Sequence, residues 1–548
     1  MTTHTMQSST PPRRSAKRRA LTVVAWISGA ALVGACFELD INNPNGLNRD
    51  TVFNNASNSE AALIGGWRRY FNNAVGRGTT PYGNATSFHI IAPVWGNEFA
   101  NVVASTREPR EPIDNVELSS PVTRGTWYDP LGTIAIAREV HNGIVANNLR
   151  FGAISTTTPN GADTPRAKIF AKFLIGISNL QLALRFDQGH LHELNTNIDT
   201  LKASDFKPSA DVNALAIRQL REVIADSKAA TEFSIPPTWI NGQTIPRDEF
   251  VRIVYSYIVR ANVYQPRSPV QRAAVNWQGV LNLLDSAITA RDFVVQADPA
   301  VSYTSSNYLA NSTSTSTTYR VSNRLFGPGD TTGRYQTWLA TPVEQRTVSG
   351  FWPVSPDRRI TGVNATTGRP DSTRAGTLLE RRTTNWGSAT SAYTASMYRT
   401  LRWVNTANDS TVRAPTPIIT LDEMRFIRAE ALYRLGRTAE VPALLNPSRV
   451  AAGLPPVTAS GPPNNASCVP RKNDRSCGDL FDAIQYEKRM VMLATDAEVS
   501  YYDQRGWGKL LAGTPLELPV SGRDLTFYGM PIYTFGGVAG NGAPAGNP

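Results

Sequence analysis

The sequence predicts a mainly α fold, in which helical hairpins stack as in tetratricopeptide arrays and join a long irregular, loop-rich part. Six segments carry apolar residues at steps of three and four, the spacing of an amphipathic helix. Between about residues 300 and 420 that spacing disappears, and Ser, Thr, Gly, Pro and isolated Trp replace it. With 41% hydrophobic and 18% charged residues over 548 positions, the composition is that of a globular protein. A disordered chain and a polytopic membrane protein are both excluded.

The predicted helices are expected to pair into hairpins. The first is the clearest, with Ile169, Phe173, Ile177 and Leu184 on one stripe and Gly189 just beyond its end. A hairpin cannot bury its apolar stripe alone, so such units come in stacks, although no strict 34-residue period is visible. The six predicted helices cover residues 166–186, 211–228, 248–265, 275–290, 420–436 and 479–500. They place the helical scaffold mainly in residues 160–295 and 420–510.

Three other segments lack a sustained period. Residues 300–420 are predicted to be an irregular insertion, and loops of this length in a compact protein usually carry function or form an irregular subdomain. Residues 67–130 also read as irregular and rich in aromatic residues. The last residues, 536–548, are mostly Gly, Ala, Asn and Pro and are expected to be disordered. The folded domain is therefore predicted to span residues 51–535.

The first 36 residues have the pattern of a bacterial lipoprotein signal. Residues 1–20 carry five basic residues and no acid, and an apolar run follows from residue 21 to 33. Val33-Gly34-Ala35-Cys36 resembles a lipobox, in which cleavage precedes a Cys that receives lipid. We expect residues 1–35 to be a signal peptide, Cys36 to carry acyl chains such as palmitate, and residues 36–50 to be a tether. An ordinary signal peptide followed by an incidental Cys is the alternative.

The charge of the chain is weakly positive. The formal net charge of +11 falls to +6 once residues 1–35 are removed, because these carry five positive and no negative groups. The sequence contains no basic stripe of the kind that nucleic acid requires, so nucleic acid is not an expected partner. Neutral glycans, acidic glycans and peptides are all compatible with this charge.

Cys468 and Cys477 are predicted to form a disulfide bond. They bracket a polar loop, and a pair of Cys residues outside the cytosol is usually oxidised. In the chain-entropy model, closing so short a loop contributes about 2.7 kcal/mol to stability. A metal site is disfavoured because the pair has no nearby His or further Cys to complete four ligands.

The sequence contains no catalytic motif. It has no H-E-x-x-H, no P-loop and no G-x-S-x-G segment. His190 and His192 would not share a face of a helix, and we interpret them as structural. Two carboxylates such as Glu98 and Asp129, each close to a Trp, would suffice for a glycosidase, but nothing distinguishes them from the other acids. We therefore expect no metal and no cofactor.

An ordered set of segments carries a resemblance to a known family. The strongest part is Glu487-Lys488-Arg489 followed by Asp503-x-x-Arg505-x-Trp507-Gly508, which is similar to a Glu-Arg and Asp-x-x-Arg-x-Trp-Gly signature. The other parts are residues 42–45, 166–189, 256–264 and 420–431. In this order, and over nearly the whole mature chain, the sequence resembles the SusD/RagB family of outer-membrane nutrient-binding lipoproteins. Two departures suggest a divergent subgroup. The stretch between Glu487 and Asp503 is about two residues longer than usual, and Glu498-Val499 stands in place of the family's Glu-Gly.

The resemblance implies a function as well as a fold. It implies a tetratricopeptide-like scaffold whose irregular part faces the ligand. It also implies a non-catalytic lipoprotein of the cell outer membrane, which captures oligosaccharides or peptides at the cell surface and passes them to a TonB-dependent, SusC-like transporter. Two alternatives remain: a surface-attached glycoside-active enzyme, and a structural or assembly lipoprotein with helical repeats.

Aromatic residues in the irregular segments are the candidates for ligand binding. A sugar ring has an apolar face that stacks on an aromatic ring and a polar rim that accepts and donates hydrogen bonds, usually within a preformed concavity. The alternative for each Trp is ordinary packing inside the protein. The candidates are Trp67, Tyr82, Trp95, Asn97, Trp127, Tyr128, Trp338, Trp352 and Trp386.

The signature residues are expected to be structural. Glu487 falls on the apolar side of its predicted helix, in line with Ile484 and Val491. A buried carboxylate needs a cationic partner. We predict an ion pair between Glu487 and Arg505, with Arg489 as the other possible partner and Trp507 packed nearby.

Overall fold

The structure is a computed structural model that describes residues 53–75, 88–101, 115, 121–303, 319–346, 351–367, 369–382, 396–402, 414–496 and 498–533. The chain divides into two units, Met1–Thr51 and Val52–Pro548, and all described residues belong to the second. The predicted signal peptide, Cys36 with its tether, the tail 536–548, Tyr82 and Trp386 lie outside the described residues.

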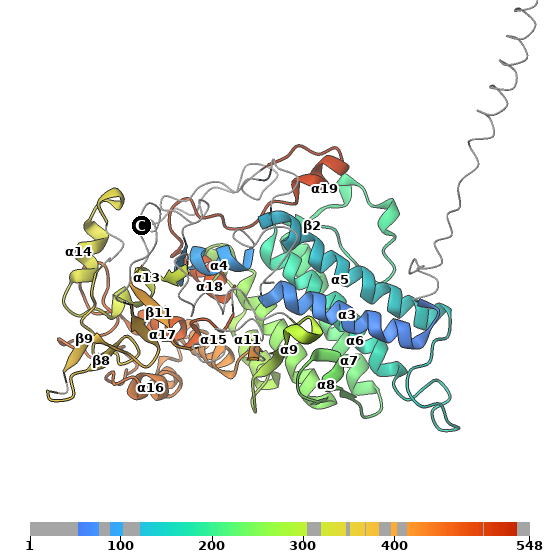
Figure 1. The fold of residues 1–548 in the computed structure, drawn as a ribbon, viewed down its shortest axis with the longest axis horizontal. Coiled ribbons are helices and arrows are strands. Elements are labelled where there is room, and N and C mark those ends of the chain that lie inside the picture. The colour runs from blue at the N-terminus through green and yellow to red at the C-terminus, as the bar shows by residue number, and fades with distance from the viewer. Residues whose placement is uncertain are drawn as a thin grey trace, which may run out of the picture. The chain divides into compact units, whose positions relative to one another are not determined.

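A stack of paired helices forms the scaffold, so the prediction of a mainly α fold is confirmed (Figure 1). Each helix contacts its successor in the following order, and α15 contacts both of the last two. The order is α3 (Ala56–Val75), α5 (Pro121–Ala146), α6 (Thr164–Arg185), α7 (Ser209–Ala229), α9 (Arg247–Tyr264), α11 (Trp277–Ser286), α15 (Leu421–Arg434), α16 (Val441–Ala451) and α17 (Leu480–Met492). Stacking of this kind buries the stripe that no single hairpin could bury.

Helix α6 is almost entirely buried within the stack. Its stripe of Ile169, Phe173, Ile177 and Leu184 is buried, and so are most of its other side chains. By length and composition α6 would be able to cross a membrane, but 89% of its apolar window is buried inside the protein. That burial identifies α6 as a core helix.

The remaining helices are short. They are α4 (Phe88–Trp95), α8 (Pro237–Ile240), α10 (Pro269–Ala273), α13 (Asn323–Phe326), α14 (Arg334–Ala340), α18 (Val499–Trp507) and α19 (Gly522–Phe527). The strands form antiparallel pairs: β1 (Phe99–Asn101) with β7 (Tyr319–Val321), β2 (Gln188–Gly189) with β3 (Lys207–Pro208), β4 (Ser234–Ile235) with β5 (Ile245–Pro246), β6 (Phe293–Ala297) with β12 (Ala414–Ile419), β8 (Thr361–Val363) with β9 (Pro370–Ala375), and β10 (Leu379–Arg381) with β11 (Tyr398–Thr400).

The loop-rich segment has a small apolar core of its own. Phe326, Tyr335, Trp338 and Phe351 pack their rings against one another there, with centroids 5.4–6.1 Å apart. The same cluster includes Met490 of α17. The described part of residues 300–420 is thus packed onto a scaffold helix, although its strands and helices are short.

Three predicted boundaries are wrong. Residues 67–130 include parts of α3 and α5 and the whole of α4, whose glycines and prolines obscured the helical period. The helix predicted at 479–500 is two helices, because Ala494 has φ +59° and leaves the helical conformation after α17. Ahead of α18, Asp496 Oδ1 accepts the backbone N–H groups of Glu498 and Val499. The helix predicted at 275–290 stops at Ser286, ahead of strand β6.

Candidate functional site

Three of the predicted ligand-binding Trp residues are core residues instead. The Trp67 side chain is fully buried and its Nε1 donates to the Ile240 carbonyl at 3.0 Å. Trp95 is fully buried against Phe88 and Tyr501, and Trp127 is 1% exposed. A Trp in an amphipathic helix is large enough to anchor a core by itself, and these three lie on helices α3, α4 and α5. None of them offers a face to a ligand.

Two polar candidates are also engaged within the protein. The Asn97 side chain is 5% exposed and its Nδ2 donates to the Lys509 carbonyl at 3.4 Å. The Tyr128 hydroxyl donates to Asp524 Oδ1. Asn97 nevertheless contributes to the wall of a groove described below.

Trp338 and Trp352 are brought together in one groove, as the ligand-site hypothesis requires. The groove has a volume of ≈ 650 Å³, within the range of small-molecule and glycan sites. Trp352 is 40% exposed, whereas Trp338 forms a buried base at 5%. We call it the aromatic groove, and its lining is Thr332, Gly333, Arg334, Thr337, Trp338, Thr341, Gln345, Arg346, Phe351, Trp352 and Arg475.

Local sequence explains how the walls of the aromatic groove are held together. The buried carboxylate of Asp330 accepts the backbone N–H of Tyr335 in α14 at 3.2 Å and that of Val354 at 2.9 Å. It therefore joins the helix that carries Trp338 to the segment that carries Trp352. Gly333, with φ +83°, supplies the left-handed turn that starts α14.

The arginines of this groove were not predicted from the sequence. Arg334, Thr337, Trp338 and Thr341 lie at i, i+3, i+4 and i+7, so they share one face of α14 and the turn that follows it. That spacing was present in the sequence and would have identified the face. Arg475 comes from a loop 137 positions beyond Trp338, and no local pattern connects the two.

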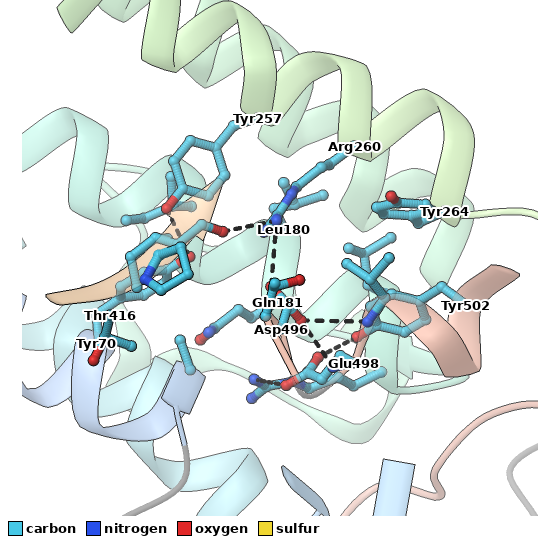
Figure 2. Close-up of a pocket in the computed structure, with 18 residues that line it drawn as sticks. Tyr70, Leu180, Gln181, Tyr257, Arg260, Tyr264, Thr416, Asp496, Glu498 and Tyr502 are labelled. Carbon is cyan, nitrogen blue, oxygen red and sulfur yellow. Dashed lines mark hydrogen bonds and ion pairs between the residues drawn. The ribbon is translucent and has the colours of Figure 1, made fainter. Parts of the chain in front are cut away.

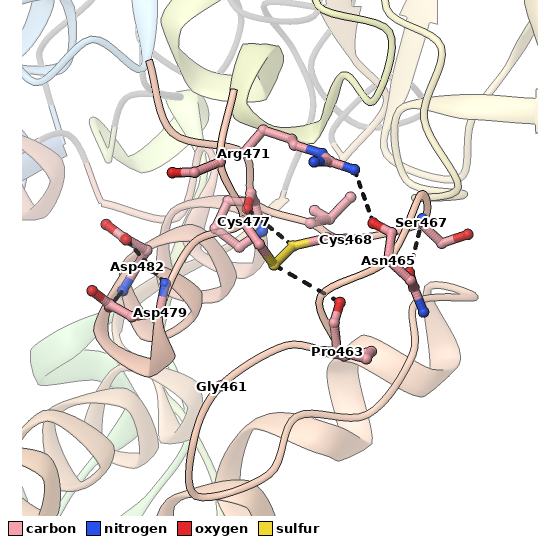
Figure 3. The surroundings of a disulfide bond; sticks show 12 residues. Gly461, Pro463, Asn465, Ser467, Cys468, Arg471, Cys477, Asp479 and Asp482 are labelled. Atoms are coloured by element: carbon pink, nitrogen blue, oxygen red, sulfur yellow. Dashed lines mark hydrogen bonds between the residues drawn. A yellow bond between two sulfur atoms is a disulfide. The ribbon is translucent and has the colours of Figure 1, made fainter. Parts of the chain in front are cut away.

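The loop that carries Arg475 is closed by a disulfide bond (Figure 3). The structure joins the Sγ atoms of Cys468 and Cys477, with their Cα atoms 5.8 Å apart. Inside the loop, Arg471 donates to the Asn465 carbonyl at 2.9 Å and to the Arg475 carbonyl at 3.1 Å. These contacts fix the backbone of the loop beside the groove.

Residues of the same loop also line a second groove, whose charges are of both signs. Its volume is ≈ 620 Å³ and its lining includes Asn97, Lys472, Asp482 and Lys509. Lys472 and Lys509 both pair with Asp482, at 3.4 and 3.3 Å. Because these cations are already partnered, the mixed-charge groove offers less to an anionic ligand than its composition suggests.

An internal cavity between α3, α6, α9 and α18 is too small for a sugar (Figure 2). Its volume of ≈ 60 Å³ holds a few water molecules at most. Figure 2 shows Arg260, Asp496, Glu498 and Tyr502 directed toward one another around it, and Arg260 pairs with Asp496 at 3.2 Å. Its polar walls are therefore a structural network.

The Glu487 prediction is correct about burial and wrong about the partner. Glu487 is fully buried, but its carboxylate pairs with Arg359 at 2.9 Å and with Arg449 at 3.2 Å. Arg505 instead donates to the carbonyls of Leu184, Tyr264 and Leu516, at 2.6–3.2 Å. The carbonyls of Leu184 and Tyr264 lie in the last turns of α6 and α9, where acceptors lack a partner within the helix, and that of Leu516 lies in a loop.

The other signature residues also serve the core. Trp507 Nε1 donates to the Glu430 carboxylate at 3.2 Å, and Asp503 pairs with Lys488 at 2.6 Å. Asp503 also pairs with Arg272 at 3.2 Å. The signature thus holds α18 against α15 and α17.

The described residues contain no group of three or more His, Cys, Asp or Glu side chains that would hold a metal ion. His190 and His192 are buried, and the ring of His190 lies 3.9 Å from that of Phe206. Burial lowers the pKa of both, and that of His192 falls to about 3. Neutral, packed imidazoles of this kind are structural.

Comparison with known proteins identifies the class of this helical scaffold. Residues 290–525 match the model of the SusD family. A SusD superfamily protein from Bacteroides vulgatus has the same fold, with 12% identity, a TM-score of 0.51, and coverage of 84% of this chain and 90% of its own. A SusD superfamily protein from Bacteroides thetaiotaomicron is 11% identical with a TM-score of 0.50, and the match covers 88% of this chain and 98% of that protein. No curated protein sequence matches the chain. The match to the SusD family therefore covers residues 290–525, and the two solved structures show that the chain shares the SusD fold.

Proposed function

We propose that the protein is a non-catalytic surface lipoprotein that binds oligosaccharides. The observation that carries this proposal is the aromatic groove, in which the exposed Trp352 and the buried Trp338 line a concavity of ≈ 650 Å³ beside Thr and Arg side chains. Aromatic faces suit the apolar side of a sugar, and the hydroxyl and guanidinium groups suit its rim. The SusD/RagB fold supports the same function.

We also propose where the protein is anchored and which protein receives its ligand. Cys36 anchors the chain to the outer membrane through its acyl chains, with the groove facing the cell surface. A TonB-dependent, SusC-like transporter receives the bound oligosaccharide. Peptide capture is the alternative for the ligand.

A binding panel tests the proposal. Purified protein is incubated with polysaccharides, oligosaccharides and peptides, and both binding and new reducing ends are measured. We expect binding of at least one glycan without turnover, and loss of that binding in Trp352→Ala. New reducing ends would instead identify an enzyme, and binding of peptides alone would overturn the glycan proposal.

The anchor and the transporter are tested in cells. Cys36→Ser should abolish incorporation of labelled palmitate and release the protein from outer-membrane fractions. Affinity purification of the unaltered protein should recover a large β-barrel receptor. Recovery of other envelope components without such a receptor would favour a structural or assembly lipoprotein.

A further inference from the structure

The aromatic groove differs from its neighbour in the sign of its charges. Its ionisable lining side chains are Arg334, Arg346 and Arg475, and its described lining contains no Asp or Glu. The mixed-charge groove, by contrast, contains Asp474, Asp479 and Asp482. Arg334 and Arg475 on one concavity create a local positive potential that the weak net charge of the chain does not predict.

Two of these guanidinium groups are available to a ligand. Arg334 is exposed and its Nη1 donates to the neutral carbonyl of Trp352 at 3.2 Å. Arg475 is exposed on the disulfide-closed loop, and its Cζ lies 3.2 Å from the place that a Cβ on Gly333 would occupy. Among the described residues, no carboxylate lies within ion-pair distance of either one. Both therefore keep donors for an anion.

The base of the groove is formed by Trp338. Its side chain is 5% exposed, and its buried Nε1–H has no acceptor among the described residues. A buried N–H without a partner costs about 1–3 kcal/mol. Because that nitrogen has almost no exposed surface, the exposed guanidinium groups are the donors within reach of a ligand.

We propose that the ligand of the aromatic groove is an acidic oligosaccharide, one whose sugars carry carboxylate or sulfate groups. The planar fork of a guanidinium binds both anions through two parallel hydrogen bonds. One face of the Trp352 ring is covered by the Arg381 guanidinium, whose Cζ lies 3.5 Å from the ring centroid. The other face of Trp352 contacts the apolar face of a sugar while Arg334 and Arg475 bind its anionic substituents. This inference rests on the proposed function of glycan binding and names the class of glycan.

Matched ligands test the inference. Calorimetry on the purified protein compares oligogalacturonate with its fully methyl-esterified form, and dextran sulfate with dextran. The acidic member of at least one pair should bind about tenfold more tightly or better, with an affinity that falls as salt is added. The pair that shows the preference identifies the anion as carboxylate or sulfate.

Variants locate the effect in the groove. Arg334→Gln and Arg475→Gln should each reduce affinity for the acidic ligand by about tenfold more than they reduce affinity for its neutral partner. Arg218→Gln is the charge-matched control, because Arg218 is half-exposed on α7 and pairs with Glu193 and Glu222. Circular dichroism verifies that each variant is folded.

Three outcomes would overturn the inference. Equal affinity for the acidic and neutral members of both pairs would refute it and leave glycan binding intact. An equal loss in Arg218→Gln would show that net charge, and not the groove, attracts the ligand. Binding of polyglutamate without binding of any glycan would refute the inference together with the proposed function.

Discussion

The carboxylate of Glu487 meets the guanidinium of Arg449 at 3.2 Å, at a place where neither side chain has any exposed surface. Arg359 forms a second ion pair with this carboxylate at 2.9 Å, and Ser448 Oγ donates a hydrogen bond to it at 3.1 Å. Arg359 comes from the loop-rich segment, Arg449 from α16 and Glu487 from α17. One buried anion therefore ties the loop-rich segment to the scaffold.

Glu487→Ala should lower the free energy of unfolding strongly. Removing the anion leaves the buried guanidinium of Arg449 without a carboxylate, whereas Arg359 keeps Asp357 at 2.7 Å. Breaking a buried ion pair in this way costs about 3–5 kcal/mol. Urea denaturation followed by circular dichroism measures the change. Glu440→Ala is the control, since Glu440 forms an exposed pair with Arg437 and its loss should leave the unfolding midpoint unchanged. Equal midpoints for Glu487→Ala and the unaltered protein would contradict the prediction.

The burial of Glu487 was predictable from the sequence, but its ion-pair partners were not. Its burial followed from its register with Ile484 and Val491 in one helix, which is local information. Its partners lie 38 and 128 positions away, and helical periodicity carries no information about contacts at such distances. Arg505, the predicted partner, instead donates hydrogen bonds to backbone carbonyls.

The same limit applies to the candidate ligand site. The scaffold helices were predictable because each has a repeating apolar stripe. Trp67, Trp95 and Trp127 were assigned to a ligand because their segments have an obscured period, yet the structure buries them in helices. Trp338 and Trp352 were named for the same reason and do share a groove. Composition identified aromatic residues, but only tertiary structure separates a core ring from an exposed one.

Trp338 and Trp352 should respond differently to truncation. Trp352→Ala should abolish most glycan binding and lower the unfolding free energy by only about 1 kcal/mol, because the side chain is 40% exposed and packs mainly against Arg381. Trp338→Ala should weaken binding and also cost about 3–5 kcal/mol, because it removes a buried ring from the small core of the loop-rich segment. Calorimetry and urea denaturation on both variants supply the measurements. A large stability loss in Trp352→Ala would show that it too is a core residue.

Opening the disulfide should weaken ligand binding as well as stability. Cys468→Ser with Cys477→Ser removes a short closed loop, a change worth about 2.7 kcal/mol in the chain-entropy model. Because Arg475 lies inside that loop and lines the aromatic groove, its loss of fixed position should also lower affinity. Binding by the double variant, compared with that of Arg475→Gln, checks this. Unchanged affinity in the double variant would show that the other loop contacts alone hold Arg475.

His192 should make the protein less stable at acidic pH. Burial, with smaller contributions from His190 and Arg138, lowers the pKa of His192 from 6.5 to about 3. In the unfolded chain the imidazole regains its ordinary pKa, so between pH 6.5 and about 3 the unfolded state binds more protons than the folded state. Stability is therefore lost as pH falls through that window, by about 2 kcal/mol at pH 5.

His192→Gln removes the titrating group, so its unfolding free energy should fall less between pH 7.5 and pH 5 than that of the unaltered protein. Urea denaturation of both proteins at the two pH values measures the difference, and carboxylates cancel because both proteins carry the same set. Parallel pH dependences would mean that His192 is protonated in the folded protein or solvated within it.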